Sequence, residues 1–247
     1  MSGSLALSPP PSLQELCDPG PVALFLDFDG TLVEIAPTPD GIEVPKTLGA
    51  GLFELSSRLG DRLALVSGRA IPDLERHLGP LRVARAGSHG AARELADGSP
   101  LGPRAESLPR GVAEALRAFA ETCGFALEGK QHGAALHYRT NPALEPEGLS
   151  FANELARTHG LEVKRGKCVI ELVRPGASKA GAVRAFMEVP PFAGARPVFI
   201  GDDITDEDGF VAAEELGGFG ILVGDRSPSA ARYRLPDPAA VHAWLGL

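Results

Sequence analysis

The sequence predicts an α/β fold, in which helices cover both faces of a parallel β-sheet and an α+β module is inserted into that core. Two patterns support this prediction. Over most of the chain, short apolar runs typical of buried strands alternate with segments of helical periodicity, and this alternation favours a parallel sheet with helices on both faces. Between Pro100 and Pro175 the character changes, and two helix-strand-strand patterns follow one another.

The individual elements are predicted from apolar periodicity and length. The expected core strands occupy 22–28, 63–67, 83–87, 197–201 and 219–223. The expected core helices occupy about 46–59, 71–78, 178–189 and 207–216, with a terminal helix around Trp244. In the inserted module we expect helices at 106–123 and 147–159, with strand pairs at 125–130 and 134–139 and at 161–164 and 168–172.

Proline and glycine mark both crossings between the core and the module, which is typical of hinges. We expect an α/β core formed by 21–103 and 177–247, and an inserted α+β module formed by 104–176. Residues 1–20 are rich in serine and proline, and we expect them to form a flexible N-terminal leader.

Composition narrows the class of protein. The chain has 247 residues, of which 44% are hydrophobic and 23% are charged, as in ordinary globular proteins. Its formal net charge of −8 argues against a nucleic-acid partner, which requires a basic surface. The three cysteines lack paired spacing, which favours free thiols in a reducing compartment. The chain contains no apolar run of membrane-spanning length and no secretion signal, so we expect a cytoplasmic protein without a membrane partner. We also expect a monomer.

Two carboxylates follow the first predicted strand. Asp27 and Asp29 are separated by one residue, so in an extended chain they project to the same side, at the strand end where open α/β sheets bind ligands. Two anions held close together need a cation, a proton or a reacting electrophile between them. The alternative is a solvated turn, because Asp and Gly are common turn residues.

A second acidic cluster, at 201–208, follows the predicted strand 197–201. Carboxylates from two strand ends favour a site for a hard divalent cation such as Mg²⁺. An alternative for the acidic residues at 206–208 is that they begin a helix, where negative charge suits the helix dipole. That alternative does not explain Asp202 and Asp203, which precede the helix.

Two further polar groups complete the pattern. Ser67, Gly68 and Arg69 follow the predicted strand 63–67 and lead into a helix, whose first backbone N–H groups favour a phosphate. Lys179 lies at the start of the predicted helix 178–189, where an ammonium group can bind a phosphoryl oxygen. Taken singly, each of these residues is more typical of a surface or cap position.

The order of these groups resembles the haloacid dehalogenase superfamily of phosphatases and phosphotransferases. Its first motif matches Asp27-Phe28-Asp29-Gly30-Thr31-Leu32. The segments 67–69, 128–130, 137–139, 166–175 and 201–208 further resemble the trehalose-6-phosphate phosphatase family, over a similarity that spans about 22–225. The resemblance implies a Rossmann-like parallel sheet core with an inserted α+β cap domain. It also implies hydrolysis of trehalose 6-phosphate to trehalose and phosphate, the last step of trehalose biosynthesis.

The resemblance implies a role for each group in the core. Asp27 is expected to attack phosphorus and form an aspartyl-phosphate, and Asp29 to act as general acid and then general base. Ser67 and Lys179 are expected to bind the phosphoryl oxygens, and Gly68 and Arg69 to belong to the substrate-binding loop. For Mg²⁺ the expected set is Asp27, Asp29 through its backbone carbonyl, Asp202 and Asp203. The sequence does not rank Asp202, Asp203 and Asp206 as direct ligands, and Asp203 and Asp206 are also candidates for orienting metal-bound water or Lys179.

In the inserted module the resemblance assigns sugar binding to polar residues that lie among strand-like apolar runs. These residues are Glu128, Lys130, Arg139, Lys167 and Glu171. Their alternative role is cross-strand salt bridging on a solvated face.

Other functions remain open at this stage. Phosphatases for sucrose 6-phosphate or mannosyl-3-phosphoglycerate, and sugar phosphomutases, would share the core residues. A non-catalytic sugar-phosphate-binding module is an alternative from a different class, but such a module is expected to have a disrupted catalytic set, and here both Asp27 and Asp29 are present.

Overall fold

The computed structural model describes residues 7–36, 41–102, 107–130, 133–166, 168–175 and 178–247, without the side chain of residue 130. The chain forms two compact units, one made of Met1–Gly102 with Ser178–Leu247 and the other of Pro103–Ala177. The first unit is built on a mostly parallel sheet and the second is α+β, which confirms the predicted fold class. No helix in the described part of the chain is long and apolar enough to cross a membrane.

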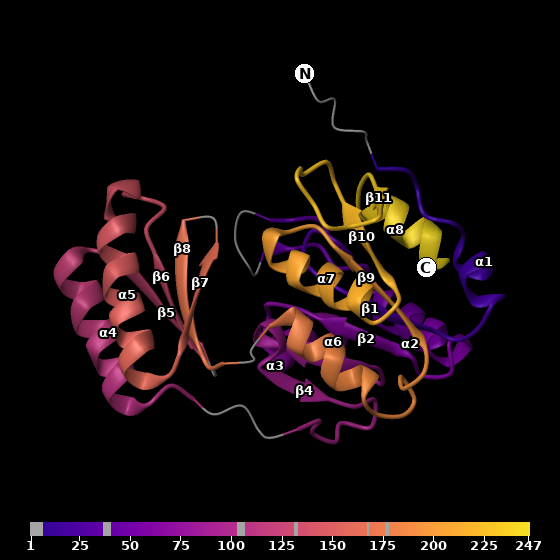
Figure 1. Cartoon of the computed structure of the whole chain (residues 1–247), viewed down its shortest axis with the longest axis horizontal. Helices are drawn as coiled ribbons and strands as arrows, with labels where there is room; N and C mark the ends of the chain where they lie inside the picture. The colour runs from indigo at the N-terminus through magenta and orange to yellow at the C-terminus, as the bar shows by residue number, and fades with distance from the viewer. Residues whose placement is uncertain (1–6, 37–40, 103–106, 131–132, 167, 176–177) are drawn as a thin grey trace. The chain divides into compact units, whose positions relative to one another are not determined.

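The first unit contains a seven-stranded sheet in the order β11-β10-β9-β1-β2-β3-β4 (Figure 1). Its strands are β1 (Val22–Leu26), β2 (Leu63–Val66), β3 (Ala84–Gly87), β4 (Ala92–Glu94), β9 (Arg196–Gly201), β10 (Phe219–Val223) and β11 (Tyr233–Leu235). Neighbouring strands run parallel except β3 and β4, which are antiparallel. The chain therefore brings β1, β2 and β9 together at the centre of the sheet, although β9 is distant from the other two in sequence.

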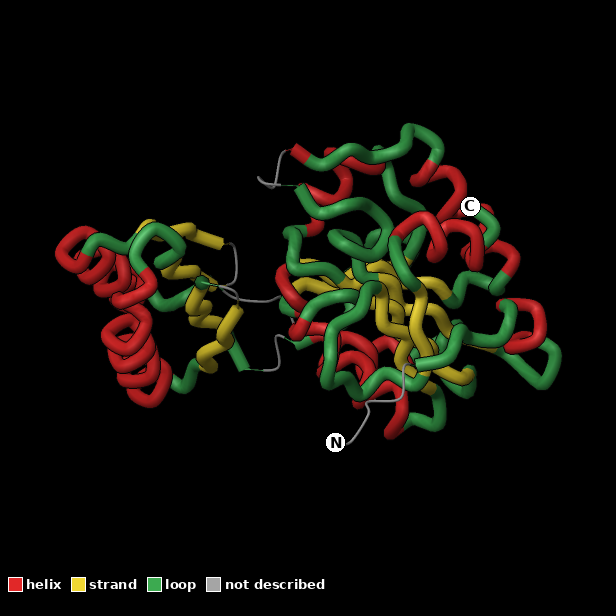
Figure 2. Tube along the Cα trace, turned by 90° about the horizontal axis from the view of Figure 1, so that it is seen from above, coloured by secondary structure: helices red, strands yellow, loops and turns green. Residues whose placement is uncertain are grey.

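Helices cover both faces of this sheet, as Figure 2 shows. They are α1 (Leu13–Cys17), α2 (Leu48–Arg58), α3 (Ile71–Leu78), α6 (Lys179–Met187), α7 (Glu207–Glu215) and α8 (Pro238–Leu245). Residues of β1 alternate between two apolar clusters, because successive side chains of a strand point to opposite faces. Leu24 packs in the cluster that includes α2 and α8, whereas Phe25 packs in the cluster that includes α6 and α7.

The second unit is a four-stranded antiparallel sheet with two helices. Its strands are β5 (Ala126–Lys130), β6 (Gly133–His137), β7 (Glu162–Gly166) and β8 (Val169–Val173), in the order β5-β6-β8-β7. Helices α4 (Arg110–Cys123) and α5 (Glu145–His159) pack on one face of this sheet (Figure 1). Phe119 of α4 stacks on Phe151 of α5 with ring centroids 3.9 Å apart, which joins the two helices through an aromatic contact.

The N-terminal segment differs from the flexible leader expected at 1–20, of which 7–20 are described. Helix α1 begins with a capping box between Ser12 and Glu15, and Leu16 is buried in the core. The indole nitrogen of Trp244 donates a hydrogen bond to the carbonyl of Pro11 at 2.8 Å. The described part of this segment is therefore anchored on the core by an apolar side chain and a hydrogen bond to α8.

The aromatic cluster behind β1 gives a test of the packing. Phe25 is fully buried. The centroid of its ring lies 5.7 Å from that of Phe192 and 6.2 Å from that of Phe186. Phe25→Ala leaves a cavity in this cluster, so we expect it to lower the free energy of unfolding by about 3–5 kcal/mol in urea titrations. The control is Phe53→Ala on α2, whose side chain is exposed, and it should cost less than about 1 kcal/mol. Equal losses in the two variants would contradict this account of the core.

Candidate functional site

The site lies where three central strands end at the same edge of the sheet. Leu26 pairs with Leu65 of β2 on one side and with Ile200 of β9 on the other. The backbone N–H of Asp27 donates to the carbonyl of Ile200 at 2.9 Å and so continues the pairing past the end of β1. Parallel pairing therefore brings the segments that follow β1, β2 and β9 to one edge, where the predicted site residues are found.

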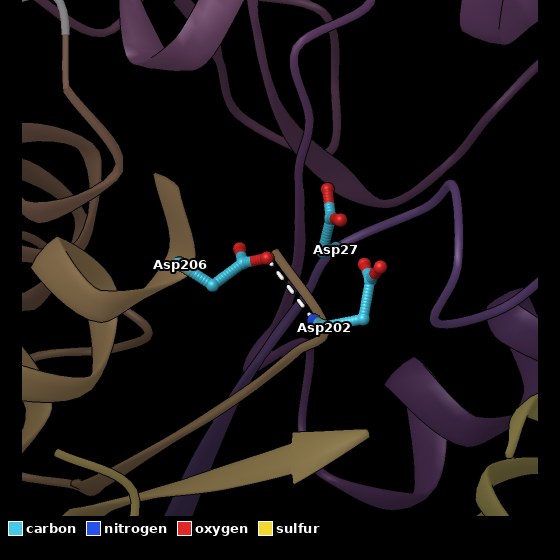
Figure 3. A group of neighbouring side chains, drawn as sticks. All are labelled: Asp27, Asp202 and Asp206. Atoms are coloured by element: carbon cyan, nitrogen blue, oxygen red, sulfur yellow. Dashed lines mark hydrogen bonds between the residues drawn. The ribbon is translucent and has the colours of Figure 1, made fainter. Parts of the chain in front are cut away.

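Three carboxylates converge at this edge. Oxygen atoms of Asp27, Asp202 and Asp206 lie within 4.8 Å of one another, and Figure 3 shows the three side chains coming together from two segments of the chain. Asp27 and Asp206 are buried, and Asp202 is partly buried. The expectation that Asp27 and Asp202 come close enough to share an ion is therefore met by the geometry.

Two glycines make room for this cluster. A Cβ atom on Gly30 would lie 2.2 Å from the Oδ2 atom of Asp202, and one on Gly201 would lie 2.2 Å from the carboxyl carbon of Asp206. Gly30 also has a positive φ of 77°, a backbone conformation that residues with a Cβ atom rarely adopt. A larger residue at either position would displace one of the carboxylates.

Asp206 holds the cluster together through its hydrogen bonds. Its Oδ2 atom accepts from the backbone N–H groups of Asp202 at 3.1 Å and Asp203 at 2.9 Å, and the first of these bonds is drawn in Figure 3. Its Oδ1 atom accepts from the Nζ atom of Lys179 at 2.6 Å. Since both of its oxygens already accept hydrogen bonds, Asp206 is suited to brace the loop after β9 and to orient Lys179.

Lys179 places a buried positive charge against the carboxylates. Its Nζ atom lies 2.9 Å from the Oδ1 atom of Asp27 and 2.6 Å from that of Asp206. Lys179 is the first residue of α6, whose N-cap Ser178 accepts a hydrogen bond from the backbone N–H of Gly181. Burial lowers the pKa of Lys179, but the charges of Asp206 and Asp27 outweigh this effect and raise it, so the ammonium group stays charged.

One ammonium group does not balance three carboxylates. Burial raises the pKa of Asp27 well above the ordinary carboxyl value, and the charge of Asp206 adds to the effect. Burial and the charge of Asp206 likewise raise the pKa of Asp202 to about 7. The cluster therefore favours a further positive charge, whether a proton or a metal cation.

The donor set fits Mg²⁺. Carboxylate oxygens are the ligands that this cation prefers. The Oδ1 atom of Asp202 is buried and accepts no hydrogen bond from the described residues, and such an atom is costly to leave without a partner. A cation between Asp27 and Asp202 would satisfy it.

Of the residues expected at the metal, Asp203 lies outside the cluster, and Asp29 was expected there only through its backbone carbonyl. The Oδ1 atom of Asp203 accepts from the backbone N–H of Ile204 at 2.7 Å, and its exposed side chain is not part of the close carboxylate group. The carboxylate of Asp29 is paired with the guanidinium group of Arg69, so only its backbone carbonyl remains suited to the metal role expected for it. Asp206, which the sequence analysis left outside the expected metal set as a candidate for orienting Lys179, occupies the third place in the cluster and contacts Lys179.

The Ser67-Gly68-Arg69 segment lies directly after β2. Ser67 is buried, and its Oγ atom accepts from the backbone N–H of Arg69 at 3.1 Å. A Cβ atom on Gly68 would lie 2.7 Å from the ring of His89, so glycine lets that imidazole approach the loop. Ser67 and Gly68 thus form a compact turn beside the end of β1.

In the second unit, two of the expected sugar-binding residues share one face of the sheet. Glu128 and Glu171 both pair with Ala135 across neighbouring strands, and their chain neighbours Leu127 and Ile170 belong to the cluster under the helices. The two carboxylates therefore belong to the face opposite α4 and α5. His137, which the sequence analysis did not single out for binding, lies 2.8 Å from the Oε2 atom of Glu128.

The other expected sugar-binding residues are less fully described. Arg139 is exposed just after β6. Lys130 ends β5, but its side chain is not among the described features, and Lys167 lies outside the described residues.

The core sheet has the fold found in phosphatases of the haloacid dehalogenase superfamily. A phosphatase of that superfamily from Bacteroides thetaiotaomicron shares the fold with a TM-score of 0.66 at 18% identity, over 92% of this chain and 93% of that one. A solved trehalose-6-phosphate phosphatase related protein aligns with a TM-score of 0.71 at 26% identity, over 91% of this chain and 95% of that one.

The chain belongs to the trehalose-phosphatase family, whose sequence profile matches residues 25–239. It is 37% identical to the trehalose-6-phosphate phosphatase of Escherichia coli (strain K12) over 226 residues, which cover 90% of this chain and 85% of that protein. It is 41% identical to a probable trehalose-phosphate phosphatase of Sinorhizobium fredii over 212 residues, which cover 84% of this chain and 80% of the relative.

Charge crowding in the cluster predicts a pH-dependent stability. The folded state raises the pKa of Asp202 from 3.8 to about 7, so it holds this proton to a higher pH than the unfolded state. Metal-free protein should therefore lose stability as the pH rises from about 4 to 7, by on the order of 4 kcal/mol from this group. Asp202→Asn removes the titration, so we expect the stability of the variant relative to wild type to increase over that range.

Urea titrations in EDTA at pH 5 and pH 8 measure this difference. Phe53→Ala is the control, because it changes an exposed side chain that does not titrate and lies outside the cluster, and it should have the same effect at both pH values. A relative stability of Asp202→Asn that is unchanged between the two pH values would contradict the prediction.

Proposed function

We propose that this chain is a Mg²⁺-dependent phosphatase that hydrolyses trehalose 6-phosphate to trehalose and phosphate, the last step of trehalose biosynthesis. The observation that carries the proposal is the buried position of Asp27 between Lys179 and Asp202, in a chain that matches the trehalose-phosphatase family over residues 25–239. This arrangement is suited to a nucleophilic carboxylate that meets a phosphate dianion.

Asp27 and Asp202 are the proposed carboxylate ligands of Mg²⁺, together with the backbone carbonyl of Asp29. The free Oδ1 atom of Asp202 supports this choice, and the fully engaged carboxylate of Asp206 argues for an indirect role there. When bound, the cation would neutralise the nucleophile and the phosphate oxygens, so that one anion can approach another. Asp203 instead serves as the N-cap of the short helical turn Ile204–Asp206, which follows β9.

The reaction divides into two displacements at phosphorus. In the first, an oxygen of Asp27 bonds to phosphorus, the bond from phosphorus to the sugar oxygen breaks, and Asp29 gives its proton to that oxygen. In the second, Asp29 takes a proton from water, the water oxygen bonds to phosphorus, and the aspartyl-phosphate bond breaks. Asp27 is thereby regenerated, and one difficult step is replaced by two easier ones.

Lys179 and Ser67 are proposed to bind the phosphoryl oxygens. An ammonium group has three donors, and in this structure two of those of Lys179 are directed at Asp27 and Asp206. The third donor is available to a phosphoryl oxygen. Because Lys179 is buried and held from two sides, it stabilises charge on the phosphoryl group without having to reorganise.

For the sugar, we propose Glu128, Lys130, Arg139, Lys167 and Glu171 as binding residues, on the strength of the family resemblance. The shared sheet face of Glu128 and Glu171 supports this set, since carboxylates in one row can accept hydrogen bonds from adjacent sugar hydroxyls. The proposed boundaries at 104–176 for the inserted module, the monomeric state and a cytoplasmic location stay predictions from the sequence.

A phosphate-release assay tests the reaction. Purified protein with Mg²⁺ should release phosphate from trehalose 6-phosphate with a higher kcat/KM than from glucose 6-phosphate or sucrose 6-phosphate, and EDTA should abolish the release. Asp27→Asn removes the nucleophile, so we expect at least a 10³-fold lower kcat, on the order of the losses seen when other nucleophiles are removed. Asp208→Asn, an exposed position on α7, is the matched control and should keep activity within about twofold. Isomerisation of a sugar phosphate without phosphate release would instead identify a mutase.

The sugar-binding set has its own test. Glu128→Gln should lower kcat/KM for trehalose 6-phosphate by about 10–100-fold, because an amide replaces a carboxylate that accepts from sugar hydroxyls. It should leave the rate with 4-nitrophenyl phosphate unchanged, since that substrate has no sugar. Glu162→Gln, an exposed residue on β7 of the same sheet, serves as the control. Equal effects of Glu128→Gln on both substrates would remove Glu128 from the proposed set.

A further inference from the structure

Arg69 and Asp29 form a paired contact of two parallel hydrogen bonds. The Nε atom of Arg69 donates to Oδ2 of Asp29 and the Nη2 atom donates to Oδ1, both at 2.7 Å. This geometry uses one whole edge of the guanidinium group and both oxygens of the carboxylate. The side chain of Arg69 is 9% exposed and that of Asp29 is 34% exposed, so the pair is sheltered on the arginine side and open on the carboxylate side.

Side chains of α3 also hold the guanidinium group in place. Its Nη1 atom donates to Oδ2 of Asp73 at 2.7 Å and lies 3.4 Å from the Nε2 atom of His77. The guanidinium carbon also lies 5.8 Å from the ring centre of Phe28, which separates the two aspartates of the first motif. Burial opposes the charged form, but the hydrogen bonds that Arg69 donates to Asp29 and Asp73 outweigh it and raise the pKa of Arg69, so the guanidinium group stays charged.

This arrangement changes the role expected for Arg69. The sequence resemblance placed it in the substrate-binding loop and gave it no particular partner. In the structure its donors are directed at Asp29 and Asp73. Arg69 is therefore positioned to act on the reaction through the carboxylate of Asp29.

We propose that Arg69 is a positioning residue that orients Asp29 and stabilises the carboxylate that forms when Asp29 protonates the departing sugar oxygen. The inference rests on the proposed function. In the first displacement the proton moves from Asp29 to the sugar oxygen as the bond between phosphorus and that oxygen breaks, and Asp29 becomes negative. A fixed guanidinium group favours this developing charge over the neutral acid, and it leaves Asp29 oriented to take a proton from water in the second displacement.

The dependence on the leaving group distinguishes this role from a structural one. A sugar oxygen is a poor leaving group and needs a proton, whereas 4-nitrophenolate leaves without one. Because kcat/KM reports the steps up to the first irreversible one, it isolates the displacement in which Asp29 acts as an acid. Arg69→Met should lower kcat/KM for trehalose 6-phosphate by about 100-fold and that for 4-nitrophenyl phosphate by less than about fivefold.

Three companion variants complete the experiment. Arg69→Lys keeps the charge but not the paired geometry, so it should recover part of the loss, to about 10-fold below wild type. Asp29→Asn with Arg69→Met should be no slower with the sugar phosphate than Asp29→Asn alone, because both changes affect the same proton transfer. Arg184→Met removes a half-exposed ion pair with Glu215 elsewhere in the core and should leave both rates within about twofold.

The outcomes separate this inference from the function on which it rests. Wild-type protein that turns over neither substrate, or that prefers another sugar phosphate, would overturn the proposed function. In the second case the preferred sugar phosphate replaces trehalose 6-phosphate in the comparison, which still tests the role of Arg69. Equal losses with the sugar and aryl substrates in Arg69→Met, or additive losses in the double variant, would overturn the role of Arg69. Retained aryl phosphate turnover also shows that the variant is folded.

Discussion

The structure depends on one electrostatic constraint, which is the burial of several carboxylates beside a single lysine. Asp27 and Asp206 are buried, and the ammonium group of Lys179 contacts both. Removing charges from water is costly unless they are paired and hydrogen bonded, so this cluster requires support from its surroundings. Backbone N–H groups after β9 donate to Asp206, and glycines at 30 and 201 provide the space for the carboxylates. The remaining imbalance is what makes the site suited to a divalent cation.

The parallel sheet meets this constraint by bringing distant segments to one edge. Strands β1, β2 and β9 are apolar and buried, so they pack tightly and carry their polar residues at the point where each strand ends. Helix α6 adds Lys179 at its first turn, and Val183 and Phe186 fix the helix in the apolar cluster behind β1. The packing that stabilises the core thus also positions Asp27, the proposed nucleophile, and its counter-charge.

The sequence predicted the features that depend on strong local patterns, and it missed those that depend on tertiary contacts. The central strands were predicted because buried parallel strands are continuous apolar runs, and the acidic segments were found because they follow those runs. Strands β4 and β11 were missed, since each has three residues and their polar side chains give no strand periodicity. Helix α1 was not predicted, because Ser12 and Glu15, which form its capping box, lie in a serine- and proline-rich segment whose composition is typical of a loop. The contact of Asp206 with Lys179 was one of the alternatives that the sequence left open. The pairing of Arg69 with Asp29 was not predicted, because sequence spacing does not show which donors meet across neighbouring strand ends.

The two aspartates of the first motif illustrate how surroundings can separate the roles of identical side chains. Asp27 is buried and faces a lysine and two further carboxylates, whereas the side chain of Asp29 is one-third exposed and faces an arginine. A nucleophile needs fixed geometry and a counter-charge that lets it approach a phosphate, and burial beside Lys179 supplies both. A general acid and base has to exchange protons with the leaving group and with water, and the partly exposed position of Asp29 allows this. The contrast between Lys179 and Arg69 as partners thus suits the two carboxylates to different steps of the proposed reaction.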